Sequence, residues 1–266
     1  MTDRSSPSLP IADTLVETSG GRIFTRVWGD VAAAAPVILF HDSLGSVELW
    51  RGFPATLASR LGRAVVAYDR LGFGRSDART EPPGLDLVAE EARDAIPVLR
   101  SALGIDRMIL LGHSVGGGMA TTAAAAHPET TLGLVTIAAQ AFVEDRTLAG
   151  VGAAKATFAE PGRFERVVRL HGDKARWVLD AWIETWLDPA FAGWTLDAAL
   201  RDLKCPVLAL HGDHDEYGSK AHAERIAALA PTPSRAVLLR DCGHVPHREQ
   251  EAQVLDEIER FVEGLG

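Results

Sequence analysis

The sequence predicts an α/β fold, in which a mostly parallel central sheet carries helices on both faces and a helical cap. Two features of the 266-residue chain lead to this prediction. Short, continuous apolar runs alternate with segments whose apolar residues recur at helical spacing, as in strands joined by crossover helices. One long segment, residues 142–203, interrupts the alternation with helical stretches and holds no good strand. That segment is therefore expected to be an insertion above the sheet.

The first half of the chain is expected to begin with a hairpin. Its strands are predicted at 12–18 and 22–29, with Gly20 and Gly21 in the turn. Buried strands then follow at 36–41, 63–68 and 107–111. Helices are predicted at 47–61, at 85–103 and from residue 114 to about 126.

The second half continues the same rhythm on either side of the insertion. Strands are expected at 132–138, 205–210 and 235–239, and helices at 219–229 and 251–265. We therefore predict one catalytic core made of residues 1–141 and 204–266, with residues 142–203 as a helical cap over the strand ends, where α/β sheets bind ligands.

Composition and charge exclude several classes of function. The net charge is −9, from 27 basic and 36 acidic residues. Binding a nucleic acid needs a concentrated basic face, so we expect no nucleic-acid partner. The first residues carry no apolar signal segment and no apolar run reaches the roughly 20 residues of a membrane span. We expect a cytoplasmic protein with no membrane partner, with Cys205 and Cys242 as reduced thiols. The oligomeric state stays open.

The first chemical motif is Gly-His-Ser-Val-Gly at residues 112–116. It follows a predicted strand and precedes an alanine-rich helix. A serine on such a strained strand-to-helix turn needs small flanking residues, because the neighbouring backbone approaches closely. A glycine-rich turn without chemistry is the alternative. The context favours Ser114 as a nucleophile.

A serine hydroxyl needs a positioned base, and the base needs an orienting acid. His244 follows the last predicted strand in a Gly-His step and is the preferred base, with His247 as its competitor. The acid is expected after the strand at 205–210, where Asp213, Asp215 and Glu216 compete. His211 and His214 in the same loop allow a metal site, but two imidazoles are too few, so we expect neither a metal nor a cofactor.

The oxyanion formed during acyl transfer needs hydrogen-bond donors. One is expected from the N–H of Val115, the residue after the nucleophile. The loop at residues 41–46, after the first buried strand, should supply the other from Ser43. The alternative for this loop is a simple strand-to-helix turn.

These four segments together resemble the α/β-hydrolase superfamily over essentially the whole chain outside the cap. The resemblance implies a Ser-Asp-His triad, and its spacing selects Asp215 as the acid. Residues 69–76 match the family's structural turn. The family usually has His-Gly at the oxyanion loop, whereas this chain has His41-Asp42. The following residues, Asp-Ser-Leu-Gly at 42–45, are similar to Asn-Ser-Leu-Gly of 3-oxoadipate enol-lactonases.

The cap is expected to choose the substrate. Trp182 and Trp186 stand one helical turn apart and either line an apolar pocket or dock the cap on the core. Its first half is basic, so that one cation there is a candidate clamp for a substrate carboxylate. The basic residues are Arg146, Lys155, Arg163, Arg166, Arg169, Lys174 and Arg176.

The resulting prediction is a serine hydrolase that cleaves a small carboxylic ester or related acyl substrate through an acyl-enzyme. Two alternatives stay open. The same triad serves enol-lactone hydrolysis or carbon–carbon bond hydrolysis in aromatic catabolism. A non-catalytic sensor on a hydrolase scaffold would bind a ligand without turnover.

Overall fold

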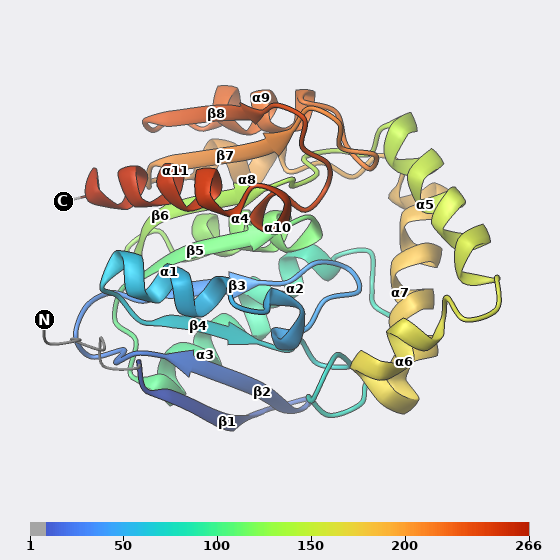
Figure 1. Ribbon diagram of the computed structural model, residues 1–266, viewed down its shortest axis with the longest axis horizontal. Coiled ribbons are helices and arrows are strands. Elements are labelled where there is room, and N and C mark those ends of the chain that lie inside the picture. The colour runs from blue at the N-terminus through green and yellow to red at the C-terminus, as the bar shows by residue number, and fades with distance from the viewer. Residues whose placement is uncertain (1–8, 266) are drawn as a thin grey trace, which may run out of the picture.

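The computed structural model of the chain describes residues 9–265, and an eight-stranded sheet runs through its middle (Figure 1). The strand order is β1-β2-β4-β3-β5-β6-β7-β8. The hairpin strands β1 (Ile11–Thr18) and β2 (Gly21–Trp28) pair antiparallel, and β2 is also antiparallel to β4 (Val65–Tyr68). All other pairings are parallel, so the predicted mostly parallel sheet is confirmed. The remaining strands are β3 (Val37–Phe40), β5 (Met108–His113), β6 (Thr131–Ile137), β7 (Val207–Gly212) and β8 (Ser234–Leu239).

Helices cover both faces of the sheet, which explains its continuous apolar runs. In β3, Val37 and Leu39 face one layer while Ile38 and Phe40 face the other, and all four are fully buried. One layer contains α1 (Phe53–Leu61) and α11 (Glu251–Glu263), next to the short α10 (Pro246–Glu249). The other contains α2 (Leu87–Asp94), α3 (Ile96–Leu103), α4 (Val115–Ala126), α8 (Asp197–Asp202) and α9 (Ala221–Leu229).

Two helices predicted as single segments are divided in the structure. The segment at 85–103 breaks at Ala95 between α2 and α3, because Pro97 has no N–H to donate and its ring crowds the preceding turn. The segment at 47–61 begins as a short 3-10 helix, Val47–Trp50, and restarts at Phe53 after Arg51, whose φ is 53°. Both interruptions correct the predicted boundaries without changing the order of elements.

The segment between β6 and β7 is helical. Helices α5 (Asp145–Phe158), α6 (Glu165–His171) and α7 (Ala175–Leu187) stand beyond the carboxyl ends of the parallel strands (Figure 1). Two 3-10 turns, Gly172–Lys174 and Pro189–Phe191, flank α7. Helix α8, by contrast, packs against α4 and α9 of the core layer. The division of the chain at 142 and 203 stays a prediction, while α5–α7 form the roof over the strand ends.

Two further features bear on the predicted environment of the chain. Cys205 and Cys242 are both free and buried, and burial raises the pKa of their thiols to about 11 and about 12, respectively. Within residues 9–265, no helix has both the length and the apolar character needed to cross a membrane.

Candidate active site

Ser114 lies on the sharp turn between β5 and α4. Its φ of 56° and ψ of −129° lie in a region that side-chain-bearing residues rarely adopt. Two glycines allow this turn. A Cβ on Gly112 would overlap the backbone of Gly116, and a Cβ on Gly116 would overlap the carbonyls that end β3. The tight turn therefore lifts the Ser114 hydroxyl above the end of the sheet.

Three residues distant in sequence form one hydrogen-bonded line. His244 Nε2 lies 3.0 Å from Ser114 Oγ, and His244 Nδ1 lies 2.9 Å from each carboxylate oxygen of Asp215. The three side chains follow β5, β7 and β8, whose carboxyl ends lie at one edge of the sheet. Ser114 is 6% exposed and Asp215 is 1% exposed. The structure thus brings together the three residues predicted for the triad.

The charges of this line favour a basic imidazole. Burial is the largest effect on Asp215 and opposes its ionisation, but the hydrogen bond and charge of His244, the charge of His211 and the Tyr217 N–H together outweigh burial and lower the pKa of Asp215. For His244, burial likewise opposes the charged form. The Asp215 hydrogen bond and the negative charges of Asp215, Glu216 and Asp42 outweigh it and raise the pKa of His244. An anchored carboxylate holds Nδ1–H, so that Nε2 is free to accept the serine proton.

The competing candidates lie elsewhere. The Asp213 carboxylate accepts the N–H of Cys242 at 3.3 Å, and Glu216 is exposed. His247 is buried against Trp50 and Phe53, and this burial keeps the pKa of its ring well below the usual value. None of the three reaches Ser114 in the hydrogen bonds of the described residues.

His211 supports the acid. Its Nε2 lies 3.2 Å from Asp215 Oδ2 and 3.1 Å from the carbonyl of Gly218. Asp215 also accepts the N–H groups of Tyr217 and Gly218, which fix its second oxygen. Residues 9–265 contain no cluster of three or more side chains suited to a metal ion, and His214 points into solvent. Sequence reasoning left His211 as loop packing, because only the fold shows its contact with Asp215.

The predicted oxyanion donors are the backbone N–H groups of Val115, next to Ser114 in the chain, and of Ser43, which lines the same cavity as Ser114. Val115 is the first residue of α4, so its N–H has no partner inside the helix. The N–H of Ser43 donates to no acceptor within residues 9–265. Asp42 holds the Ser43 loop in place, because its carbonyl accepts Gly45 N–H at 3.1 Å and its carboxylate accepts Leu44 N–H at 3.0 Å. The donor role of Ser43 and Val115 stays a prediction.

A cavity open to solvent lies above Ser114. Its apolar walls include Trp182 and Trp186, as one of the two predictions for these residues requires. Trp186 also packs against Phe191 and Trp194, which belong to the same segment between β6 and β7. The complete lining is Asp42, Ser43, Leu44, Leu49, His113, Ser114, Gln140, Thr147, Val151, Trp182, Trp186, Tyr217, His244 and Val245.

The basic residues of the cap do not line this cavity. Lys155 pairs with Glu184 at 2.9 Å, and Lys174 donates to carbonyls of the turn at residues 73–76. Arg146 donates to the carbonyl of Asp215. The predicted carboxylate clamp from the cap is therefore absent from the lining. The long side chains of these cations instead contact the Glu184 carboxylate and backbone carbonyls outside the lining.

Sequence reasoning missed two polar residues beside the nucleophile. The side-chain amide of Gln140, buried after β6, lies 3.4 Å from Ser114 Oγ. Asp42 Oδ2 lies 3.3 Å from His113 Nδ1, and His113 Nε2–H donates to the carbonyl of His244 at 2.8 Å. The only sequence signal was Asp42 in place of the family's glycine. The Asp42 carboxylate and the backbone carbonyl of His244 thus lie at opposite nitrogens of the same imidazole.

This arrangement gives a prediction for Asp42→Asn. Removing a negative charge that favours the imidazolium should lower the pKa of His244, so that the ring stays neutral down to a lower pH. NMR titration of the His244 ring measures the shift. Glu48→Gln, which removes an exposed carboxylate outside the cavity, is the control. A His244 pKa that stays equal or rises in Asp42→Asn contradicts the predicted coupling.

Comparison with known proteins places the chain by sequence. A family model described as the alpha/beta hydrolase fold matches residues 35–179. The chain is 34% identical over 137 residues to mouse (Mus musculus) 1-acylglycerol-3-phosphate O-acyltransferase ABHD5, a match that covers 50% of this chain and 37% of the relative. It is 36% identical over 102 residues to mouse (Lyso)-N-acylphosphatidylethanolamine lipase, covering 38% and 29%. The matches thus span only about a third of the length of these curated relatives.

Solved structures share the architecture over nearly the whole chain. A membrane phospholipase A, described as a bacterial virulence factor, superimposes with a TM-score of 0.78 at 22% identity, covering 96% of this chain and 86% of that one. The esterase RhEst1 from Rhodococcus sp. ECU1013 superimposes with a TM-score of 0.69 at 25% identity, covering 96% and 99%. The first of these shows the fold alone.

Proposed function

The chain belongs to the alpha/beta hydrolase fold family, as the four motifs predicted. On this premise we propose that it is a serine hydrolase of small carboxylic esters or related acyl substrates. The observation that carries the proposal is the line from Asp215 through His244 to Ser114 Oγ, which ends in an apolar cavity. A pure receptor has no need of a serine in hydrogen-bond contact with an anchored imidazole.

In the proposed reaction, Ser114 Oγ attacks the substrate carbonyl carbon while His244 Nε2 takes the hydroxyl proton. The carbonyl oxygen becomes an oxyanion that accepts from the N–H groups of Ser43 and Val115, and one such donor is worth about 10²–10³ in rate. His244 then gives its proton to the departing alcohol, which leaves an ester on Ser114. Water, deprotonated by His244, releases the acid and restores the serine.

The cavity and the relatives favour acyl transfer among the alternatives. The wall above Ser114 is largely aliphatic and aromatic, which suits an acyl chain. The relatives' printed names, an acyltransferase and a lipase, both concern acyl groups, and RhEst1 is an esterase. The enol-lactone and carbon–carbon alternatives use the same triad and differ in substrate.

A substrate panel tests the proposal. A short-chain p-nitrophenyl ester, an enol-lactone and a ring-cleavage dienone are assayed side by side with the full chain. We expect release of p-nitrophenol with an initial burst equal to the enzyme present, as an accumulating acyl-enzyme gives. If the dienone is cleaved and the p-nitrophenyl ester is not, carbon–carbon bond hydrolysis would replace ester hydrolysis as the proposed activity. Ligand binding without turnover of any of the three would support the sensor.

A further inference from the structure

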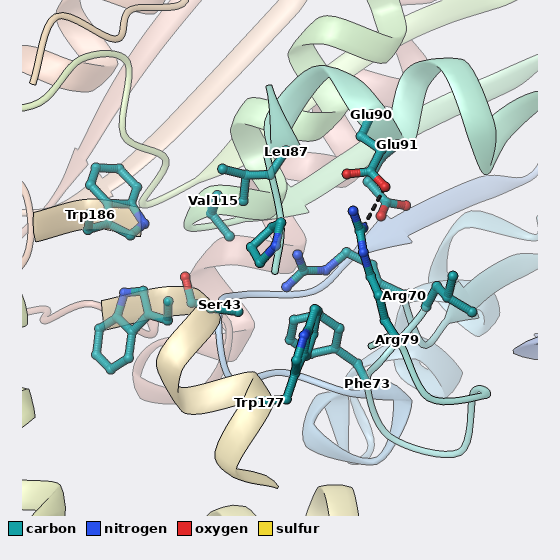
Figure 2. Close-up of a pocket in the computed structure, with 14 residues that line it drawn as sticks. Ser43, Arg70, Phe73, Arg79, Leu87, Glu90, Glu91, Val115, Trp177 and Trp186 are labelled. Atoms are coloured by element: carbon teal, nitrogen blue, oxygen red, sulfur yellow. Dashed lines mark hydrogen bonds and ion pairs between the residues drawn. The ribbon is translucent and has the colours of Figure 1, made fainter. Parts of the chain in front are cut away.

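A second compartment adjoins the cavity above Ser114. It is narrow and shares Ser43, Trp182 and Trp186 with that cavity, so the two meet at the oxyanion loop. Its far wall is charged, with Arg70, Arg79, Glu90 and Glu91 beside Phe73 and Trp177 (Figure 2). We name it the side compartment. His244 lines the first cavity only.

Arg70 is the unusual group in the side compartment. The residue is 5% exposed, and its guanidinium lies 4.0 Å from the ring centre of Phe73. Nη2 donates to the carbonyl of Asp42 at 2.8 Å, and Nε points at His41 Nε2 at 3.4 Å. In the described part of the chain, Nη1 has no hydrogen-bond partner and no carboxylate forms an ion pair with Arg70. A buried cation therefore keeps one donor edge open.

The neighbouring carboxylates act on Arg70 from a distance but form no ion pair with it in the described part of the chain. Glu90 is already paired with Arg79 at 2.5 Å, the contact dashed in Figure 2. Glu91 accepts the Tyr68 hydroxyl at 2.7 Å, and burial raises the pKa of Glu91, which weakens its tendency to ionise. A buried cation without a paired anion is costly, and a bound anion would relieve that cost.

The position of His244 decides which part of a substrate faces Arg70. The leaving alcohol must lie near His244, because His244 supplies its proton, and His244 lines the first cavity. The side compartment begins at Ser43 and Val115, the predicted donors to the carbonyl oxygen, and does not reach His244. A group bound in the side compartment therefore belongs to the acyl half of the substrate.

We propose that Arg70 binds a carboxylate carried by the acyl half of the substrate, so that the preferred substrates are monoesters of short dicarboxylic acids. The proposal rests on the ester hydrolase function proposed above. One open N–H edge and two nearby glutamates suit a single negative charge better than a dianion. The clamp sought among the basic residues of the cap is thereby supplied by the core, from the turn after β4.

The test compares esters that differ only in charge. Monomethyl adipate carries the carboxylate, and methyl 5-carbamoylpentanoate replaces it by a neutral amide of the same shape, with the shorter succinate and glutarate pairs alongside. Proton release at constant pH gives kcat/KM for each. We expect the wild-type protein to favour the anionic member of the best pair by about tenfold or more, as a charged hydrogen bond provides. Arg70→Gln should reduce this ratio at least about tenfold.

Arg75→Gln is the matched control, because Arg75 lies in the same turn as Arg70 but pairs with the partly exposed Asp13 and lines neither compartment. It should leave the ratio close to that of the wild-type protein. An Arg70→Gln protein that loses both esters equally would show that Arg70 only holds the oxyanion loop through Asp42, and would overturn the proposal.

The wild-type comparison decides the matter even if Arg70→Gln fails to fold. A wild-type preference for the neutral amides would overturn the carboxylate subsite while leaving ester hydrolysis intact. Hydrolysis of none of these esters or of the p-nitrophenyl ester would overturn the proposed function itself, and the subsite with it.

Discussion

Ser114→Ala is expected to lower kcat by about 10⁴-fold or more on any ester that the wild-type protein hydrolyses. The substitution removes the only atom that would bond to the substrate carbon and leaves the pairing of His244 with Asp215 intact. Because alanine is smaller than serine and the site is tight, we expect the fold to persist. Steady-state kinetics on the best ester of the panel measures the loss.

The control for this change is Ser101→Ala, which removes an exposed hydroxyl on α3, outside the cavity lining. Its kcat should stay within about twofold of the wild-type value, since surface substitutions of this kind are close to neutral. A Ser114→Ala protein that keeps near-normal turnover, with a normal thermal unfolding transition, would remove Ser114 from the reaction.

Asp215→Asn is expected to lower kcat by about 10⁴-fold as well. The amide can still accept the N–H groups of Tyr217 and Gly218, so the loop should remain in place. It presents an NH₂ group to His244, however, and this favours the tautomer with the proton on Nε2. A ring with that tautomer cannot take the proton of Ser114.

Asp213→Asn is the matched control for Asp215→Asn. The two carboxylates lie in the same loop after β7, but Asp213 accepts the N–H of Cys242, and no hydrogen bond within residues 9–265 joins it to His244. We expect Asp213→Asn to retain turnover within a few-fold of wild type. Equal losses in the two variants, measured by kcat at saturating ester, would mean that the loop as a whole rather than the Asp215 carboxylate is needed.

Local patterns were sufficient to predict the framework of the site. The apolar runs and helical periods follow directly from burial on both sheet faces. The Gly-His-Ser-Val-Gly turn needs small residues for steric reasons, and this requirement can be recognised from the sequence alone. Each of the three residues follows a parallel strand, and the carboxyl ends of parallel strands lie at one edge of the sheet. Pro54 and Pro97, in the first turns of α1 and α3, also indicated where the two predicted helices divide. The apolar period alone did not indicate this division.

The remaining contacts depend on tertiary packing. His211 meets Asp215, and His113 lies between Asp42 and the backbone carbonyl of His244, in segments that no periodicity connects. Arg70 lies in a turn that the family resemblance explained as architecture alone, and its open donor edge is visible only where α2 and α7 enclose it with the oxyanion loop. The basic composition of the cap suggested the opposite location for a carboxylate clamp.

Labelling with a fluorophosphonate tests the activated serine most directly. The reagent forms a stable covalent bond, with loss of fluoride, to a serine oxygen that a neighbouring imidazole has made nucleophilic. Intact-mass analysis should show one adduct on the wild-type chain, peptide mapping should locate it at Ser114, and Ser114→Ala should gain none. A wild-type chain that stays unmodified, or an adduct of equal yield on Ser114→Ala, would show that the line from Asp215 to Ser114 does not make a nucleophile.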